Sequence, residues 1–180
     1  MHFNYSVDSS KGNTEISPIY NIQDENTPLS ANYILMIKPK PDLPDSLMKK
    51  AVVVRLEGER KASIGGTWDN GYMTVHPKGF GRYVVMIDLY RPIIRPINIF
   101  KGKDMSRDKD IAFEVTDNLS GVKYFRATVD GKWILTEFNP KNNEVYYTFD
   151  EHVGKGKHHL RFVVSDEVGN TNVYEAEFTR

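Results

Sequence analysis

The C-terminal half of the chain contains the same strand-and-turn pattern twice. Residues 113–116 (Phe-Glu-Val-Thr) lead into Asp117–Gly121, and residues 162–165 (Phe-Val-Val-Ser) lead into Asp166–Asn170. Apolar residues in alternation predict a strand with one buried face, and turns begun by aspartate and closed by glycine or asparagine connect such strands. The pattern therefore predicts an antiparallel β-sandwich.

Seven strands are predicted in the C-terminal half, separated by turn signals about every ten residues, which is typical of an Ig-like or fibronectin-III-like sandwich. They are Ile93–Ile99, Ile111–Thr116, Val122–Val129, Lys132–Phe138, Val145–Phe149, His158–Ser165 and Val173–Phe178. Asp130-Gly131 between two of these strands predicts a two-residue hairpin turn.

The N-terminal half also predicts strands, together with one short helix over residues 44–50. The predicted strands are Tyr33–Ile37, Ala51–Leu56, Lys61–Ile64, Thr67–Trp68, Tyr72–His76 and Arg82–Asp88. Residues 1–31 are polar and rich in turn formers, and the proline-containing stretch Leu89–Pro92 marks a domain boundary. The predicted fold is all-β, with two tandem antiparallel β-sandwich domains over residues 1–91 and 92–180.

Composition excludes several classes of protein. Lysine and arginine total 24 and so do aspartate and glutamate, so the basic excess of a nucleic-acid-binding protein is missing. The chain has no cysteine, which excludes disulfides and thiolate zinc sites, and no apolar run approaches the roughly 20 residues of a membrane span. Residues 1–6 lack the features of a signal peptide, so either the protein is cytosolic or a leader has been removed upstream. We expect the second, because Asn4–Val7 has the pattern of a strand entered midway.

No catalytic motif is found in the sequence. None of the five histidines has metallopeptidase spacing, and the adjacent His158 and His159 are expected on opposite faces of a strand, where they cannot chelate one ion. Ser63–Gly66 is interpreted as a strand interrupted by a bulge rather than a nucleophile elbow. Gly154–Lys157 is interpreted as a hairpin turn, because it lacks the spacing of a phosphate-binding loop.

Two groups of acidic residues have a structural and a functional interpretation. Asp104, Asp108 and Asp110 fit a solvated loop, with a calcium site as the alternative. Asp117 and Asp166 are expected to accept hydrogen bonds from backbone N–H groups of their own turns.

Four aromatic residues are the candidates for a binding surface: Trp68, Trp133, Tyr146 and Tyr147. Every second aromatic residue of an alternating strand normally faces the core, and Trp133 occupies a position suited to the core tryptophan of a sandwich. Packing in the core or at a sheet edge is therefore the expectation for these residues. A stacking surface for sugars is the alternative.

Several blocks resemble, in order, the C-terminal non-catalytic region of M23-family (lysostaphin-like) cell-wall metallopeptidases. They are Thr27–Leu29, Tyr33–Lys38, Leu43–Leu47, Ile64–Tyr72, Phe80–Asp88, Ile94–Asn98, Asp117–Val122, Asp130–Leu135, Val164–Asn170 and Tyr174–Phe178. The resemblance covers most of the chain from about residue 16 onward.

The zinc motifs of that family, His-x-x-x-Asp and His-x-His, are absent. The residues four positions after the histidines are Ser6, Phe80, Gly156, Phe162 and Val163. The resemblance therefore implies a chain without catalytic or metal-binding residues, in the periplasm or cell envelope. It implies that zinc is held only by a peptidase domain, upstream in the same polypeptide or in a partner. It also implies peptidoglycan or envelope glycans as partners.

A stand-alone glycan-binding or adhesive Ig-like module is the alternative. Such a module would expose Trp68 or Trp133 on a flat face, whereas a scaffold would bury both. For the accessory region, binding loops cluster at the ends of sandwiches, so the predicted contacts are the turns Gly65–Asp69, Asp117–Gly121 and Asp166–Asn170.

Overall fold

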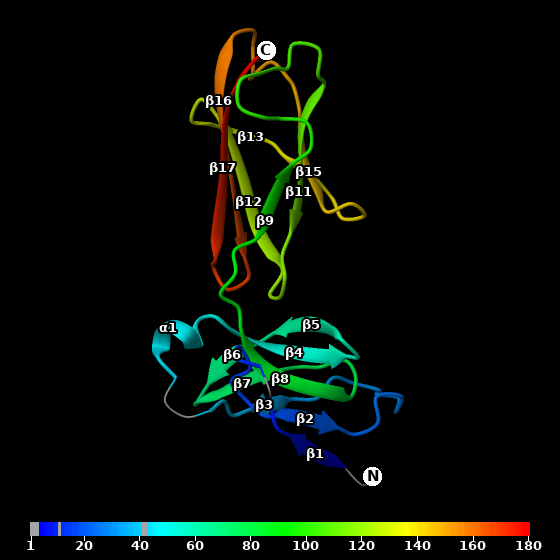
Figure 1. Ribbon diagram of the computed structural model, residues 1–180. Coiled ribbons are helices and arrows are strands. Elements are labelled where there is room, and N and C mark those ends of the chain that lie inside the picture. The colour runs from blue at the N-terminus through cyan, green and yellow to red at the C-terminus, as the bar shows by residue number, and fades with distance from the viewer. Residues whose placement is uncertain (1–3, 11, 41–42) are drawn as a thin grey trace. The chain divides into compact units, whose positions relative to one another are not determined.

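The computed structural model describes residues 4–10, 12–40 and 43–180. Its regular secondary structure is almost entirely β-strand, with one short helix, α1 (Asp45–Met48), inside the predicted range (Figure 1). The chain divides into two compact units, Met1–Leu89 and Tyr90–Arg180. None of the helical segments in the described residues has the length and apolar character needed to span a membrane.

The first domain has two antiparallel sheets. The five-stranded sheet has the order β1 (Tyr5–Asp8), β2 (Ile19–Ile22), β8 (Gly81–Ile87), β4 (Ala51–Glu57), β5 (Arg60–Gly65). The three-stranded sheet has the order β3 (Leu35–Ile37), β7 (Tyr72–Val75), β6 (Thr67–Asp69). Strand β1 overlaps the strand expected over Asn4–Val7, whereas no strand was predicted where β2 lies. Pairing of β2 with the distant strand β8 stabilises this polar segment as sheet, because strand preference depends strongly on tertiary context.

The chain passes from one sheet of the first domain to the other at Gly66, between β5 and β6. Gly66 has φ +135°, and a Cβ atom placed on it would lie 2.7 Å from Cε of Met73. Only glycine fits this corner without strain. Just before it, Val53 pairs with Gly65 and Val54 with Ser63, so the predicted bulge in this strand is confirmed.

The second domain also has two sheets, of five and four strands. The first has the order β10 (Lys103–Asp104), β17 (Thr171–Thr179), β16 (Lys157–Asp166), β12 (Val122–Val129), β13 (Lys132–Ile134). The second has the order β14 (Glu137–Asn139), β15 (Glu144–Thr148), β11 (Asp110–Thr116), β9 (Ile93–Pro96). All pairs are antiparallel except β10 with β17, and the Ig-like or fibronectin-III-like sandwich predicted here is confirmed.

The predicted strand Lys132–Phe138 is two strands. Strand β13 pairs with β12 in the five-stranded sheet, and β14 pairs with β15 in the other sheet. The apolar alternation runs across both strands, so it gives no sign of the change of sheet at residues 135–136. This division decides the environment of Trp133.

Each domain has its own core. In the first, Val53, Val85 and Tyr83 of the five-stranded sheet pack with Ile37 and Met73 of the three-stranded sheet. In the second, the rings of Phe113 and Phe162 stack between the two sheets, with centroids 4.5 Å apart. Stacked aromatic pairs of this kind stabilise a core beyond the burial of their area.

Two hairpin turns have the predicted geometry. Asn70 and Gly71 both have positive φ between the paired residues Asp69 and Tyr72. Asp130 and Gly131 likewise both have positive φ, between the paired residues Val129 and Lys132 at the β12–β13 turn. Both are two-residue turns of the primed type that Asn-Gly and Asp-Gly favour.

Candidate functional site

Asp166 organises the turn between β16 and β17. Its side chain is fully buried, and Oδ1 accepts hydrogen bonds from the backbone N–H groups of Val168 (3.0 Å) and Asn170 (2.7 Å). The side-chain amide of Asn170 donates to Oδ2 at 2.6 Å. The predicted role of Asp166 is confirmed, and its carboxylate is occupied by its own turn.

Asp117 has the same role in the turn after β11. Its Oδ2 accepts hydrogen bonds from the backbone N–H groups of Leu119 (3.0 Å) and Gly121 (2.8 Å). The repeated sequence pattern thus encodes two similar side-chain-to-backbone turns.

The acidic residues of the loop around β10 do not converge on one point. Asp104 Oδ1 accepts the backbone N–H of Ser106 (2.9 Å), and this bond is the main reason that the pKa of Asp104 is lowered. Asp108 forms an ion pair with Lys103 (3.1 Å), and Asp110 Oδ1 accepts from the side chain of Asn98 (2.8 Å). Each of the three carboxylates therefore has a different protein partner.

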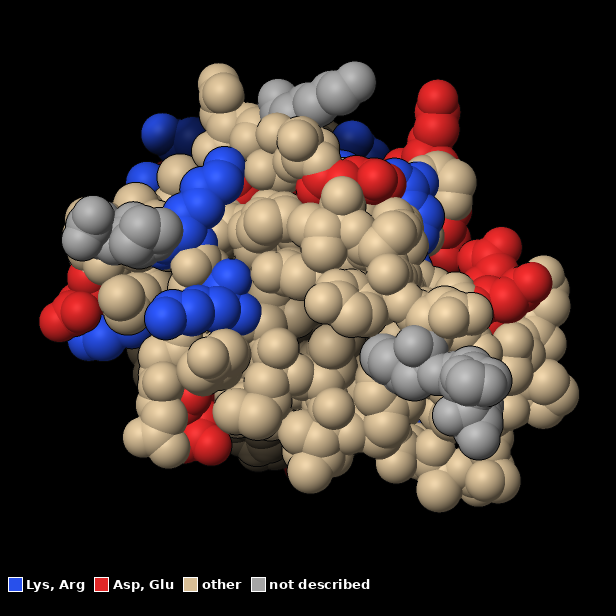
Figure 2. Space-filling model, turned by 90° about the horizontal axis from the view of Figure 1, so that it is seen from below, with Lys and Arg blue, Asp and Glu red and all other residues tan. Residues whose placement is uncertain are grey.

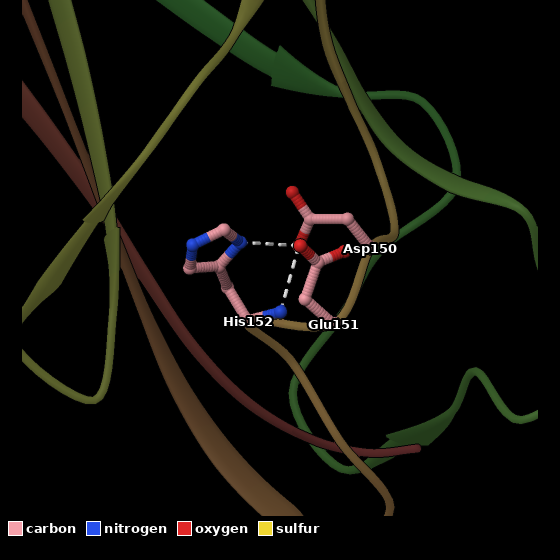
Figure 3. Close-up of side chains that lie close together, drawn as sticks. All are labelled: Asp150, Glu151 and His152. Carbon is pink, nitrogen blue, oxygen red and sulfur yellow. Dashed lines mark hydrogen bonds and ion pairs between the residues drawn. The ribbon is translucent and has the colours of Figure 1, made fainter.

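Asp150, Glu151 and His152 lie close together on an exposed turn (Figure 3). Asp150 Oδ1 accepts hydrogen bonds from the hydroxyl of Tyr147 (2.5 Å) and from the backbone N–H of His152 (3.0 Å), and Nδ1 of His152 lies 3.1 Å away. The bond from Tyr147 is the largest cause of the lowered pKa of Asp150. Local turn bonding therefore explains why these side chains meet.

His158 is held between two hydrogen-bond acceptors. Nδ1 lies 2.8 Å from Oδ2 of Asp130 and Nε2 lies 2.9 Å from the carbonyl oxygen of Gly154. Neither ring nitrogen is free to bind a metal or to move a proton. The neighbouring His159 is exposed, as expected for a residue on the opposite face, and His2 lies outside the described residues.

A pocket of about 570 Å³ lies beside this histidine, over the paired ends of β16 and β17. Its lining includes Asp130, Lys157, His159, Glu177 and Phe178. The carboxylate of Asp130 is bonded to His158 and to the backbone N–H of His159 (2.8 Å), so it is held in place at the pocket wall.

Core packing is confirmed for Tyr147, which is 3% exposed in the core of the second domain. Burial, and then its hydrogen bond to Asp150, raise the pKa of Tyr147 to about 12. Trp68 is half-buried against the core of the first domain, and its Nε1 donates a hydrogen bond to the carbonyl of Met48 (2.6 Å). Neither side chain presents a stacking surface.

Tyr146 and Trp133 lie on outer faces of different sheets. Tyr146 is half-buried, and its hydroxyl donates to Glu137 (3.0 Å), which raises its pKa. The core position predicted for Trp133 is wrong: the side chain is 56% exposed, because β13 is a short edge strand and Ile134 faces the core. The four aromatic candidates therefore do not form one surface, and Trp133 alone is displayed.

Trp133 belongs to the outer face of the five-stranded sheet, which we call the Trp133 face. It consists of Trp133, of Tyr124, Arg126 and Thr128 on β12, of Arg161 and Val163 on β16, and of Val173 and Glu175 on β17. Sequence reasoning missed Tyr124 and Arg126. The alternation of β12 could have identified them, because Ala127 and Val129 face the core and Tyr124 and Arg126 therefore face outward.

The first domain displays apolar residues on two edge strands, Tyr5 and Val7 on β1 and Met36 on β3, and Ile34 just before β3. In the view of Figure 2, charged side chains lie mainly around the margin and uncharged ones fill the centre. No single sign of charge dominates this view, in line with the balanced composition.

Comparison with known families gives one match. Residues 1–88 match the model of the Zu5-like domain, a segment that corresponds to the first domain and to just under half of the chain. No curated protein sequence matches the chain.

Three solved structures have a general likeness to the chain. The endo-β-1,4-mannanase of Thermotoga petrophila has a TM-score of 0.43 at 12% identity, over 51% of this chain and 20% of its own. The fibronectin(III)-like modules of Clostridium thermocellum CbhA have a TM-score of 0.39 at 12% identity, over 98% of this chain and 93% of theirs. Dimeric latent PorU of Porphyromonas gingivalis has a TM-score of 0.39 at 13% identity, over 98% of this chain and 24% of its own. At these scores the likenesses add nothing to the fold seen in the structure.

Proposed function

We propose that the chain is the non-catalytic accessory region of an M23-type cell-wall peptidase. In this role it positions or covers the catalytic domain, or docks it to peptidoglycan and other envelope components. The chain itself holds no cofactor, and the zinc belongs to the peptidase domain upstream. The proposal places the chain in the periplasm or cell envelope.

The observation that carries this proposal is the way in which the polar groups of the second domain are used. The carboxylates of Asp117, Asp150 and Asp166 accept hydrogen bonds within their own turns, and the ring of His158 bridges two acceptors. Side chains whose polar atoms are bonded within the fold are suited to holding a rigid shape and not to catalysing a reaction. The ordered sequence blocks supply the link to the peptidase family.

The test compares an M23 catalytic domain alone, the same domain joined to this chain, and the chain alone. We expect the chain alone to release no peptides from purified peptidoglycan and to bind no stoichiometric zinc. We expect the joined protein to differ from the isolated catalytic domain in sedimentation with insoluble peptidoglycan or in turnover. Equal behaviour of the two catalytic proteins, or zinc-dependent hydrolysis by the chain alone, would overturn the proposal.

A second candidate function, a stand-alone glycan-binding or adhesive module, is favoured by the exposure of Trp133. An indole ring on a flat sheet face is the feature that distinguishes a glycan-binding module from a scaffold with buried tryptophans. Trp133→Ala should abolish retention on glycan arrays or peptidoglycan while the circular dichroism spectrum stays unchanged. The matched control is Phe100→Ala, since Phe100 is an equally exposed aromatic residue (62%) outside the Trp133 face.

A further inference from the structure

The Trp133 face combines two exposed aromatic rings with a cation between their positions. Trp133 lies opposite Thr128 in the β12–β13 pair, and Arg126 is the diagonal neighbour of Trp133 on the same face, at about 7–8 Å between backbones. Tyr124 lies two residues further along β12, about 7 Å from Arg126. All three side chains point away from the core, because Ala127 and Val129 point into it.

The two rings are available for a ligand. Trp133 and Tyr124 are each about half exposed, and within the described parts of the chain neither side chain makes a hydrogen bond or a ring contact. An exposed ring with an unused N–H or O–H group offers an apolar surface together with a polar group at its edge. Sugar rings, which have apolar C–H faces and hydroxyl rims, match this combination.

Arg126 differs from the other arginine of the face. Arg161 forms an ion pair with Glu175 on the neighbouring strand. Among the described residues the side chain of Arg126 has no ion pair and no hydrogen bond, and its neighbours across the sheet are Val163 and Val173. An unpaired guanidinium beside apolar side chains is a ready bidentate partner for a carboxylate.

We infer that the Trp133 face binds an acidic polysaccharide, in which sugar rings stack on Trp133 and Tyr124 and a uronic-acid carboxylate pairs with Arg126. This inference rests on the glycan-binding candidate proposed above and holds with or without an accompanying peptidase. The inferred ligands are acidic glycans in particular, since a neutral polymer leaves the guanidinium of Arg126 without a partner.

The experiment measures binding of the full chain to immobilised polygalacturonate and to its carboxyl-reduced, neutral counterpart. We expect binding to the acidic polymer that weakens with added salt, and weaker binding to the neutral one. Arg126→Ala should lower affinity for polygalacturonate about tenfold or more, as expected for the loss of a charge-assisted hydrogen-bonded pair, and Arg126→Lys should restore part of it. Trp133→Ala should lower affinity for both polymers.

Two controls separate this site from general effects. Arg60→Ala removes an arginine whose side chain is 79% exposed in the first domain, and Phe100→Ala removes an exposed aromatic residue outside the face. Neither should change binding. If Arg60→Ala weakens binding as much as Arg126→Ala, attraction is non-specific and the inference is wrong.

Further outcomes distinguish this inference from the glycan-binding candidate itself. Equal binding of both polymers that depends on Trp133 but not on Arg126 keeps the glycan-binding function and overturns the acidic ligand. If the folded chain binds neither polymer, the acidic-ligand inference and the glycan-binding function are both wrong. Capture of a protein partner through Trp133 does not change this conclusion. Equal binding of polygalacturonate and of a sulfated polymer without carboxylates, such as dextran sulfate, overturns the preference for carboxylates.

Discussion

The ring of His158 joins two segments of the second domain through Asp130. Its Nδ1 lies 2.8 Å from Asp130 Oδ2 at the β12–β13 turn, while Nε2 lies 2.9 Å from the carbonyl of Gly154 in the loop before β16. Since both nitrogens face acceptors, only the doubly protonated ring donates to both. The ring also lies beside the core residue Phe178, with centroids 5.4 Å apart.

Replacement of His158 should destabilise the second domain. His158→Gln keeps at most one of the two hydrogen bonds, and we expect it to lower the free energy of unfolding by about 1–3 kcal/mol. The exposed neighbour gives the matched control, His159→Gln, with an expected change within about 0.5 kcal/mol. Urea unfolding measures both, with Trp133 fluorescence reporting the second domain in a Trp68→Phe background. Equal effects of the two variants would contradict the bridging role.

Asp130 should make the second domain sensitive to acid. The hydrogen bond from His158 is the first cause that holds the pKa of Asp130 below its usual 3.8. A carboxyl whose pKa is lower in the folded state contributes stability above the unfolded value, and this contribution is lost as pH falls through the folded value. Asp130→Asn should therefore lose less stability than the wild type below about pH 4. Parallel stability curves for the two proteins would refute this assignment.

Tyr147 should make the second domain sensitive to alkali. Burial raises the pKa of Tyr147 from 10.0 to about 12, so its contribution is complete below pH 10 and is lost as pH rises toward 12. Tyr147→Phe removes the hydrogen bond to Asp150 at a cost of about 1 kcal/mol at neutral pH. The variant should show a shallower loss of stability between these two pH values in urea titrations. A steeper loss would show that the phenol is not the group responsible.

The two aspartate turns should differ in their contribution to stability. Asp166→Ala removes a fully buried acceptor of three hydrogen bonds, and we expect a loss of about 3 kcal/mol. Asp117→Ala removes an acceptor of two hydrogen bonds that is half-buried, with an expected loss of about 1–2 kcal/mol. Thermal and urea unfolding should rank the variants in this order. The reverse order would show that burial does not set the strength of these turns.

The corner at Gly66 should not tolerate a side chain. Gly66→Ala combines positive φ with a contact of 2.7 Å to Met73, and we expect a loss of about 2 kcal/mol in the first domain. Gly79 of the same domain has no positive φ, and a Cβ on it would lie no nearer than 3.8 Å to Arg55, so Gly79→Ala serves as the control and should be close to neutral. Fluorescence of Trp68, in a Trp133→Phe background, follows the first domain. A neutral Gly66→Ala variant would mean that the corner relaxes freely.

Features that depend on a few consecutive residues were predictable from the sequence. The turns at Asn70-Gly71 and Asp130-Gly131 follow from the low cost of positive φ in these residues. The self-bonded turns at Asp117 and Asp166 follow from the reach of an aspartate side chain to N–H groups two to four residues away. With the strand alternation between them, these turns sufficed to predict an all-β fold.

The candidate site could be predicted only in part. Trp133 was identified as an aromatic of interest, but its exposure depends on the change of sheet between β13 and β14, which the alternation does not reveal. Arg126 is one of many charged residues in the sequence. It becomes distinctive only beside Val163 and Val173 of other strands, where no acidic side chain pairs with it.

The sequence by itself determined the turns, the strand periodicity, the balanced charge and the separation into two halves, because each depends on local backbone preference or composition. Tertiary structure decided which apolar positions are covered, which strands share a sheet, and that His158 meets an aspartate 28 residues away. These features depend on strands brought together from distant parts of the chain, and the periodicity of one strand does not specify what packs against it.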